Sequence, residues 1–549
     1  MRPRVYWTGA FFTNSSLAIV NRRLVSALIA RDNVDITVAT DPLIPDALPD
    51  EFRLLASRRG FGADEADFVV AHQFPTRFAA PAGARCIHFQ PWEFGSIPLA
   101  WFQPLHDDCD DVWVYASANR DAYIADGIDA SRVAVIPLGI DPAVFNPDGP
   151  RMQIPPAGFR FLFVGGTLDR KGVDVLLAAY QRAFRRADDV ALTIKDANTQ
   201  TLYKGQTRGA EIQALAARGD VPRIEYSDAV FPDAAMAQLF RAADCLVLPY
   251  RGEGFSLPVL EAMACGLPVI VTAGGATDDF VDERVGWRVP ATRRELSAGI
   301  PVPTLRPAWL LEPDVDALAA AMREAFQYRD ETRRRGNEAA QRARTWTWDR
   351  SASIVERRIA ELCARPAIPG KDRAERYRNP ANYTERIFGS GPLDGVVLEL
   401  FRRIGTERAT FVDVVEHGAF SIGPALGLGM GWRGVAIVLT AGMMERARER
   451  YRDCPRVAFA NDLRLQDVKP NFDLLALDCS DAGTAMKAVA PLSPRVVACG
   501  AASVSAFEEA AIRANYVPIA RDDERGDVLY VRGDLTSRCG FAHLALLQR

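Results

Sequence analysis

The sequence has few lysines and few histidines, and its cysteines are scattered. Six lysines stand against sixty arginines, and only five histidines occur in 549 residues. The nine cysteines form no Cys-x-x-Cys pair, which argues against a disulfide framework and a structural zinc site. The formal net charge of -4 lacks the basic excess of a nucleic-acid-binding protein. No apolar run reaches the roughly 18 residues of a membrane span, and the first residues are too short in apolar length for a signal peptide.

Length and composition are those of a soluble protein with several domains. A chain of 549 residues exceeds what one hydrophobic core usually holds. Apolar residues make up 48% and charged residues 25% of the sequence, which is ordinary for globular proteins. We therefore expect a soluble, cytoplasmic, multidomain protein.

Strand-like and helix-like segments alternate along the first two thirds of the chain. The runs "RVYW" (4–7) and "VDITVAT" (34–40) flank a segment with helical periodicity, which predicts a βαβ unit. A second series opens at "FRFLFVGGTLDRKG" (159–172) and ends in helices. We therefore predict two Rossmann-like domains, residues 1–150 and 158–364.

A third alternating pattern follows a polar segment. Residues 365–388 contain prolines and lack periodicity, so they are predicted to be a linker. Residues 389–549 include the apolar runs "TFVDVV", "FDLLALDC" and "PRVVACG", which predict a third Rossmann-like domain. The predicted fold class is therefore α/β throughout.

Two glutamates with seven residues between them lie in "RGEGFSLPVLEAMACGLPVIVT" (251–272). Glu253 follows the strand-like run "DCLVLPY", and the carboxyl edge of a parallel sheet is where ligands bind. Ser256 is a predicted N-cap and Pro258 suits a first helical turn, so a short helix should begin here. Glu261 then lies about one turn into that helix.

The types of residue around this helix start suit a nucleotide diphosphate that carries a sugar. Glu253 can accept hydrogen bonds from sugar hydroxyls, and Glu261 can accept them from a ribose diol. The alternative is a capped surface helix with two solvated acids, which the surrounding glycine, proline and strand order disfavour. Unpaired amides at a helix start hold phosphate oxygens, and here they belong to Gly254, Phe255, Ser256 and Leu257.

This stretch resembles the Glu-x7-Glu signature of retaining glycosyltransferases with the GT-B fold, glycosyltransferase family four, group 1. The resemblance covers roughly residues 1–365. It implies two Rossmann-like domains that face a cleft, with the acceptor on the N-terminal side and the donor on the C-terminal side. It also implies that Glu261 binds the ribose, that Glu253 contacts the donor sugar, and that no catalytic metal is needed.

Basic residues at two strand ends extend the predicted donor site. Arg170 and Lys171 follow one strand, and Lys195 ends the next. Cations placed there can neutralise a leaving diphosphate; the alternative is ordinary surface charge. Relatives often carry arginine where Gly166 stands, and Arg170 is the candidate to supply that charge.

On the N-terminal side, His88 stands at the end of a predicted strand. The resemblance implies that it contacts the donor sugar near the reacting carbon; the alternative is a buried core histidine. Glu93 follows in the loop and is predicted to line the acceptor cleft. Relatives hold glycines near the diphosphate after their first strand, and this sequence has Asn14, Ser15 and Ser16 there.

The third domain resembles class I S-adenosylmethionine-dependent methyltransferases at "FVDVVEHGAFSIG". Glu416 and His417 stand where small residues usually let the cofactor approach, and Val438 or a neighbour stands where an acid would bind its ribose. We favour a degenerate domain used for structure or partner contacts. An active sugar O-methyltransferase is the alternative, with Asp413, Glu416 and Asp478 as its candidate residues.

The predicted function is transfer of a hexose from a nucleotide-diphosphate sugar to a glycan or lipid-linked acceptor. We expect retention of configuration, no metal and no cofactor, in bacterial polysaccharide or glycoconjugate synthesis. A bifunctional glycosyltransferase and methyltransferase, or a non-catalytic Rossmann scaffold, are the alternatives. The arginine-rich helix near 331–362 allows contact with the inner face of the membrane, although a solvated helix face is more common.

Overall fold

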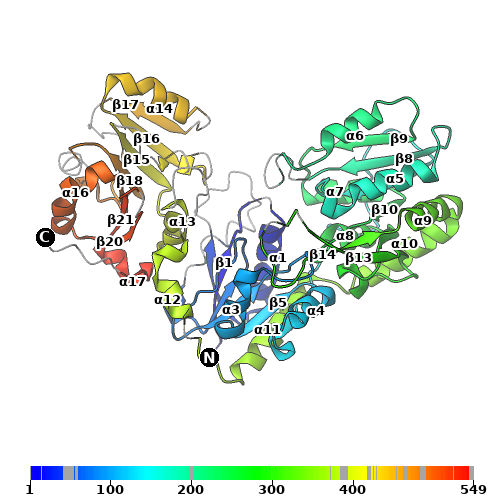
Figure 1. Ribbon diagram of the computed structural model, residues 1–549, viewed down its shortest axis with the longest axis horizontal. Coiled ribbons are helices and arrows are strands. Elements are labelled where there is room, and N and C mark those ends of the chain that lie inside the picture. Colours follow the sequence, from blue (N-terminus) through cyan, green and yellow to red (C-terminus); the bar gives the residue numbers. More distant parts are fainter. Residues whose placement is uncertain are drawn as a thin grey trace. The chain divides into compact units, whose positions relative to one another are not determined.

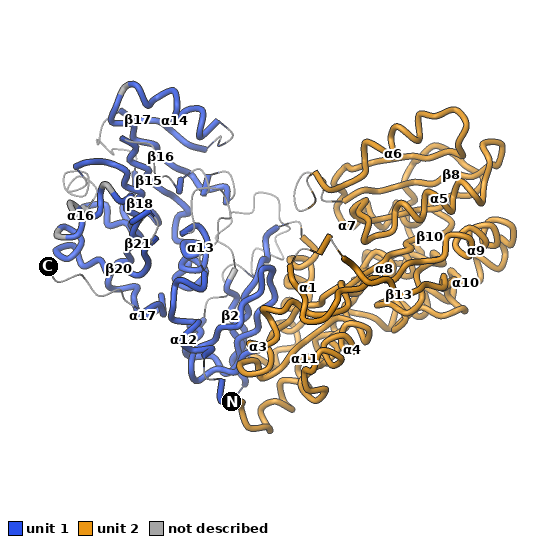
Figure 2. Tube along the Cα trace, in the orientation of Figure 1, with its two compact units in different colours: residues 1–13, 35–86, 369–549 blue, residues 14–34, 87–368 orange. Residues whose placement is uncertain are grey.

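The computed structural model divides the chain into two compact units, which are coloured separately in Figure 2. Unit 1 comprises residues 1–13, 35–86 and 369–549, and unit 2 comprises residues 14–34 and 87–368. The structure describes residues 2–542 except 14, 41–54, 56–57, 59, 198, 200–202, 204, 298, 301, 371, 384–392, 417–421, 424–425, 428–429, 453, 455, 462–467, 482–489 and 523–524.

Unit 1 begins with three parallel strands. Strand β1 (Arg4–Gly9) lies between β2 (Asp35–Thr40) and β3 (Phe68–Ala71). The first two strands are those that the apolar runs predict. The predicted domain boundaries stay a prediction, because segments of the first 150 residues fall in both units.

The rest of unit 1 is built on a seven-stranded sheet (Figure 1). Its order is β17-β16-β15-β18-β19-β21-β20, and β21 runs antiparallel to both of its neighbours. The other neighbouring pairs are parallel. The strands are β15 (Thr410–Val415), β16 (Arg433–Val438), β17 (Val457–Ala460), β18 (Leu474–Asp478), β19 (Val496–Cys499), β20 (Tyr516–Arg521) and β21 (Val528–Arg532).

Alternating side chains of this sheet enter two hydrophobic cores. Leu474 and Ala476 belong to one core, which includes residues of α13, while Leu475 and Leu477 belong to the other, which includes Phe507 of α16. A period of two is the geometry of a strand with both faces covered. The helices of this region are α12 (Arg373–Arg378), α13 (Leu393–Ile404), α14 (Met444–Arg450), α16 (Ala501–Arg513) and α17 (Thr536–Cys539).

Unit 2 contains two sets of parallel strands. In the first set β5 (Asp111–Val114) lies between β4 (Arg85–Phe89) and β6 (Val133–Val135). The helices that accompany it are α1 (Ser16–Arg31), α3 (Leu99–Asp107) and α4 (Ser117–Ala125).

The second set is a six-stranded parallel sheet of order β12-β11-β10-β7-β8-β9 (Figure 1). Its strands are β7 (Phe159–Val164), β8 (Val190–Lys195), β9 (Arg223–Ser227), β10 (Cys245–Leu248), β11 (Val269–Thr272) and β12 (Gly286–Val289). Its helices are α5 (Val173–Ala183), α6 (Gly209–Ala216), α7 (Asp233–Arg241), α8 (Leu257–Ala264), α9 (Val315–Gln327) and α10 (Arg329–Ala343). Helix α11 (Trp348–Cys363) instead packs against α1, and its Arg358 forms an ion pair with Asp111 of β5.

The predicted α/β class, with more than one Rossmann-like sheet, is confirmed. A short antiparallel hairpin of β13 (Ala291–Glu295) and β14 (Trp309–Pro313) was not expected from the sequence. All nine cysteines are free, and eight of them are buried. Among the helices that the structure describes, none is both long and apolar enough to cross a bilayer.

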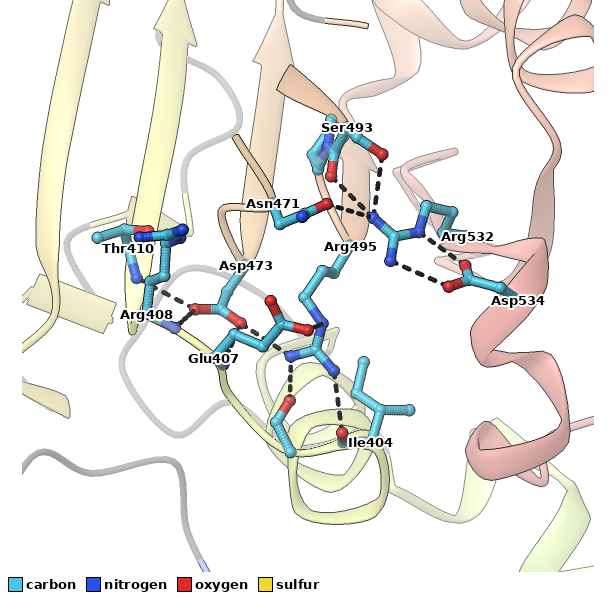
Figure 3. Close-up of polar contacts among 12 residues, drawn as sticks. Ile404, Glu407, Arg408, Thr410, Asn471, Asp473, Ser493, Arg495, Arg532 and Asp534 are labelled. Atoms are coloured by element: carbon cyan, nitrogen blue, oxygen red, sulfur yellow. Dashed lines mark hydrogen bonds and ion pairs between the residues drawn. The ribbon is translucent and has the colours of Figure 1, made fainter. Parts of the chain in front are cut away.

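A buried ion pair fixes the start of the seven-stranded sheet (Figure 3). Asp473 and Arg495 are both buried, and their Oδ1 and Nη1 atoms lie 2.9 Å apart. Asp473 also accepts hydrogen bonds from the amides of Glu407 and Arg408, and Arg495 donates to the carbonyl of Ile404. The pair therefore joins the end of α13 to the first residues of β18 and β19.

We predict that Asp473→Asn lowers the local free energy of opening of this sheet by about 3–5 kcal/mol, because Arg495 then stays buried with only the half-exposed Glu407, 3.7 Å away, as a counter-charge. Asp534→Asn is the matched control. Asp534 pairs with Arg532 at 2.7 Å, but its side chain is 57% exposed, so about 1 kcal/mol or less is expected. Hydrogen exchange of peptides that cover β15 and β18 measures both effects, and equal effects would contradict the prediction.

Candidate active site

The order of the six-stranded sheet in unit 2 reverses between β7 and β10. These strands are neighbours although about eighty residues separate them, and the sheet grows outward from this pair in both directions. At such a switch point the loops beyond the carboxyl ends of the strands diverge and leave a crevice for ligands. The loop after β7 carries Arg170 and Lys171, and the loop after β10 carries Glu253. The topology thus brings these predicted residues to one place.

Four of the predicted site residues form one charged cluster. The carboxylate of Glu253 makes an ion pair with Nζ of Lys171, and their side chains are only 6% and 12% exposed. Nη1 of Arg170 lies 3.5 Å from Oε1 of Glu93 and 4.0 Å from Oε2 of Glu253. Arg170 also donates to the carbonyl of Gly252 at 2.5 Å. The cluster thus joins residues predicted separately for the donor and acceptor sides.

Electrostatics keep Arg170 charged in this cluster. Burial lowers its pKa, but the negative charges of Glu93 and Glu253 outweigh that effect, and the pKa is raised. Buried charges that lack partners are costly, and the partners here are opposite charges. An anionic ligand that enters the crevice therefore meets cations already held in place.

A glycine lets the two loops approach each other. Gly172 adopts φ 69°, and a Cβ there would lie 1.9 Å from the carbonyl oxygen of Pro249. The amides of Arg251 and Gly252 donate to the carbonyl of Arg170 at 2.8 and 3.3 Å. The main chain therefore fixes the position of Lys171 relative to the loop after β10.

Arg251 supports this loop and was not identified from the sequence. Its buried guanidinium donates to both carboxylate oxygens of Asp174 at 2.7 and 2.8 Å, and to those of Glu312 at 2.7 and 2.9 Å. Burial lowers the pKa of Arg251, but the two carboxylates outweigh it and raise the pKa. No local pattern indicates this network, because Asp174 lies on α5 and Glu312 on β14.

The start of α8 differs from the prediction in one respect. The helix begins at Leu257 and Ser256 occupies the N-cap position, but its hydroxyl makes no capping hydrogen bond. The reason is that Ser256 has φ 75°, in the left-handed region. Its Oγ is buried and has no hydrogen-bond partner among the described residues. Gly254 and Phe255 precede it, and the ring of Phe255 packs in the core against Phe280.

Glu261 lies on α8, and its carboxyl group is largely shielded from solvent. Burial raises its pKa to about 8; the negative charge of Asp233 also raises it, and Arg23 opposes this effect. Arg23 itself pairs with Asp233 at 2.8 Å. At neutral pH the carboxyl of Glu261 is therefore mainly protonated, and it can both donate and accept a hydrogen bond.

Lys195 ends β8, as the sequence predicts, but its contacts differ from those of Lys171. Its ammonium donates to the carbonyl of Asp196 and lies 5.3 Å from the centre of the Phe231 ring. Burial lowers its pKa. Among the described residues no contact links it to Glu253, so its predicted role toward the diphosphate stays a prediction.

His88 lies on β4 inside an aromatic cluster. It is fully buried, its Nε2 lies 3.3 Å from the hydroxyl of Tyr123, and its ring meets Trp101 edge-on at 5.2 Å. Burial lowers the pKa of His88 to about 3, so the ring is neutral. This placement favours the core-histidine alternative; contact with a donor sugar would require the neighbouring rings to move, and it stays a prediction.

The predicted residues near the start of α1 have local structural roles where they are described. The Oγ of Ser15 caps the helix by accepting from the amide of Ala18 at 3.2 Å. Ser16 is the first, exposed residue of the helix. Asn14 lies outside the described residues, so the predicted role of this loop is untested.

The place of Gly166 is filled by another side chain. A Cβ at Gly166 would lie 2.6 Å from the ring of Tyr203. A longer residue such as arginine would therefore have to displace that ring. Arg170 is the arginine that reaches the charged cluster.

A small cleft of about 40 Å³ opens beside the charged cluster, lined by Trp92, Glu93, Glu253 and Trp309 among others. The hairpin that carries Trp309 is tied to the loop after β4, because the Trp309 amide donates to the carbonyl of Phe94 at 3.0 Å. This volume is far below that of a usual small-molecule site. Binding of a sugar here therefore requires the surrounding loops to open.

Part of this chain is similar to a known protein family. Residues 158–327 match the family described as Glycosyl transferases group 1. Arg170, Lys171, Lys195, Glu253 and Glu261 all lie inside the matched range.

Two curated relatives illustrate the similarity. The chain is 29% identical over 167 residues to the D-inositol 3-phosphate glycosyltransferase of Segniliparus rotundus, which covers 29% of this chain and 35% of the relative. It is 27% identical over 257 residues to the MMP alpha-(1->4)-mannosyltransferase of Mycolicibacterium hassiacum, with 45% and 54% covered. The chain thus spans about a third to a half of the length of these relatives.

Among solved structures, sucrose-phosphate synthase from Thermosynechococcus elongatus superposes with a TM-score of 0.47 at 17% identity. The superposition covers 66% of this chain and all of that chain.

The candidate residues for binding S-adenosylmethionine make hydrogen bonds to other residues of the protein. Asp413 is buried and accepts from the hydroxyl of Tyr451. Glu416 accepts from the amide and the hydroxyl of Ser480 at 2.7 and 2.8 Å. At the end of β16 stands the buried Val438.

The described part of this region therefore does not fit the cofactor. Val438 is followed by the exposed Leu439 and Thr440, so no carboxylate stands at this strand end to accept from a ribose diol. The carbonyl of Asp478 accepts from the amide of Glu416, which joins the ends of β15 and β18. His417 lies outside the described residues.

We predict that Glu261→Gln removes a pH-dependent loss of stability. Since the folded-state pKa of about 8 exceeds the ordinary 4.5, the folded protein binds more protons between these values, and its stability falls as pH rises through them. The variant should match wild type at pH 5 and melt at a higher temperature at pH 9. Glu211→Gln, whose side chain is 62% exposed, is the control, and an equal change in Tm for both variants would contradict the prediction.

Proposed function

We propose that this protein transfers a hexose from a nucleotide-diphosphate sugar to a glycan or lipid-linked acceptor. The observation that carries the proposal is the buried pair of Glu253 and Lys171, with Arg170 beside it, at the switch point of the sheet. The pair lies within the segment that matches the group 1 glycosyl transferases. Its charges and its place suit a donor that carries a diphosphate.

The cations and the start of α8 would receive the leaving diphosphate. Lys171 and Arg170 present positive charge at the strand ends, where negative charge develops as the glycosidic bond breaks. Helix starts bind phosphate oxygens. In α8 Pro258 has no amide hydrogen and the amides of Val259 and Leu260 donate to the carbonyl of Ser256, so the amide of Leu257 is the candidate donor. The buried hydroxyl of Ser256, which makes no cap bond, is a further donor at this position.

The two glutamates have different tasks in this proposal. Without a donor, Glu253 neutralises Lys171. A bound diphosphate would take over Lys171, and the carboxylate of Glu253 would then accept hydrogen bonds from sugar hydroxyls. Glu261, with its raised pKa, can donate to one ribose hydroxyl and accept from the other.

Retention of configuration, independence from metal and a role in bacterial polysaccharide or glycoconjugate synthesis are proposed from the resemblance. No side chain is assigned as a nucleophile; the leaving phosphate would help to remove the proton of the acceptor hydroxyl. A cytoplasmic location, with peripheral contact to the membrane for a lipid-linked acceptor, belongs to the same proposal.

We further propose that residues 389–549 form a methyltransferase-like domain without methyl transfer. The doubly covered, mainly parallel sheet supports such a fold. The engagement of Glu416 by Ser480 and the lack of an acid at the end of β16 among the described residues speak against cofactor binding. The bifunctional alternative is therefore disfavoured, and a scaffold without catalysis stays the other alternative.

Release of nucleoside diphosphate from UDP-, GDP- and ADP-sugars, with EDTA present, tests the proposal. Wild type should turn over one donor class, and Glu253→Gln and Lys171→Met should each lose about 100-fold or more, because each removes a charged group from the reacting centre. Glu211→Gln, exposed in the same matched segment, should keep wild-type activity.

Two outcomes would contradict it. If wild type neither binds nor hydrolyses any donor, the scaffold alternative applies. If EDTA abolishes turnover, the reaction depends on a metal and the assignment of charge neutralisation to Lys171 and Arg170 is wrong.

A further inference from the structure

A cavity of about 620 Å³ lies at the amino edge of the seven-stranded sheet in unit 1. It is lined by residues at the beginnings of four strands that are adjacent in the sheet, β17, β16, β15 and β18. The methyltransferase motif concerns the carboxyl ends of the strands, so this cavity lies at the opposite edge. It is unrelated to any residue assigned above.

Each of these four strands contributes one cation. Arg408 precedes β15, Arg433 begins β16, Arg456 precedes β17 and Lys469 precedes β18. The strands are parallel, so their amino ends share one edge and the four side chains converge on one cavity. Such convergence arises from the topology, since the cations are spread over about sixty residues of sequence.

Three of the cations that line the cavity have no acidic partner among the described residues. Within the described part of the chain, no acidic side chain forms an ion pair with Arg408, Arg433 or Lys469. One acid, Glu407, also lines the cavity, but its Oε1 lies 3.7 Å from Nε of the buried Arg495. Among the described lining residues, Glu407 is therefore the one carboxylate, and it already lies beside Arg495.

Hydrogen bonds to the buried Asp473 hold the backbone of two residues that line the cavity (Figure 3). The carboxylate of Asp473 accepts from the amides of Glu407 and Arg408 at 2.8 and 2.9 Å. Figure 3 shows Arg408 and Thr410 on one side of Asp473 and Arg495 on the other. The Oγ1 of Thr410 is buried and has no hydrogen-bond partner among the described residues. The backbone that carries Arg408 is therefore held in place, and Thr410 at the start of β15 adds an unused hydroxyl.

We propose that this cavity binds a small phosphorylated molecule. Arginine side chains match phosphate oxygens with paired N–H donors, and three of the four cations are arginines. The volume falls in the range of small-molecule sites and exceeds what a single inorganic phosphate fills. A sugar phosphate or a diphosphate supplies both the charge and the bulk that the cavity accepts.

Titration of the full-length protein with inorganic pyrophosphate and with a hexose 1-phosphate tests the proposal, with the uncharged hexose as the negative probe. Arg408→Ala/Arg433→Ala should raise Kd at least about 100-fold, since each of the two lost charged hydrogen bonds costs about tenfold or more in affinity. Arg446→Ala/Arg448→Ala is the matched control: both arginines are exposed on α14, and the change in net charge is the same.

The site is supported if either phosphate binds and affinity falls only in the first double variant; which probe binds more tightly then tells a diphosphate from a sugar phosphate. The proposal is overturned if neither phosphate binds wild type, or if both double variants weaken binding equally, which would indicate general surface charge. Thermal melting without ligand shows that the variant is folded, and donor hydrolysis, which uses other residues, reports separately on the proposed transferase activity.

Discussion

The contact between Lys171 and Glu253 depends on the order of strands in one sheet. Because β7 and β10 are neighbours, the loops that follow them must meet, and two charged side chains are buried where they do. Buried opposite charges need each other, so each loop restricts where the other can lie. Gly172 permits the close approach, and Arg251 ties the second loop to α5 and β14. A diphosphate would compete for a cation whose position is already set.

Much of this arrangement is predictable from the sequence. The alternation of apolar runs places Lys171 and Glu253 at carboxyl ends of strands, and strand ends share one edge of a parallel sheet. The partners of Arg251 are not predictable in this way, because they lie on distant elements. The left-handed backbone of Ser256 and the enclosure of His88 by aromatic rings also depend on packing that one strand or helix does not reveal.

The two edges of the sheet in the C-terminal part of unit 1 differ in what they offer a ligand. Its sheet has two well-formed cores, and the α/β pattern was predicted from its apolar runs. At the carboxyl ends of the strands, the Glu416 carboxylate accepts a hydrogen bond from Ser480. At the amino ends the sheet gathers Arg408, Arg433 and their neighbours around a cavity. The fold alone does not say where a ligand binds, and the amino edge is the more promising place for one.

The most direct test of the account is a crystal structure of the full-length protein with the nucleoside diphosphate that it binds. We predict phosphate oxygens within hydrogen-bond distance of Nζ of Lys171 and of the amide of Leu257 at the start of α8, with the ribose against Glu261 and the Glu253 carboxylate released from Lys171. A nucleotide bound elsewhere, with the pair of Lys171 and Glu253 intact, would contradict it.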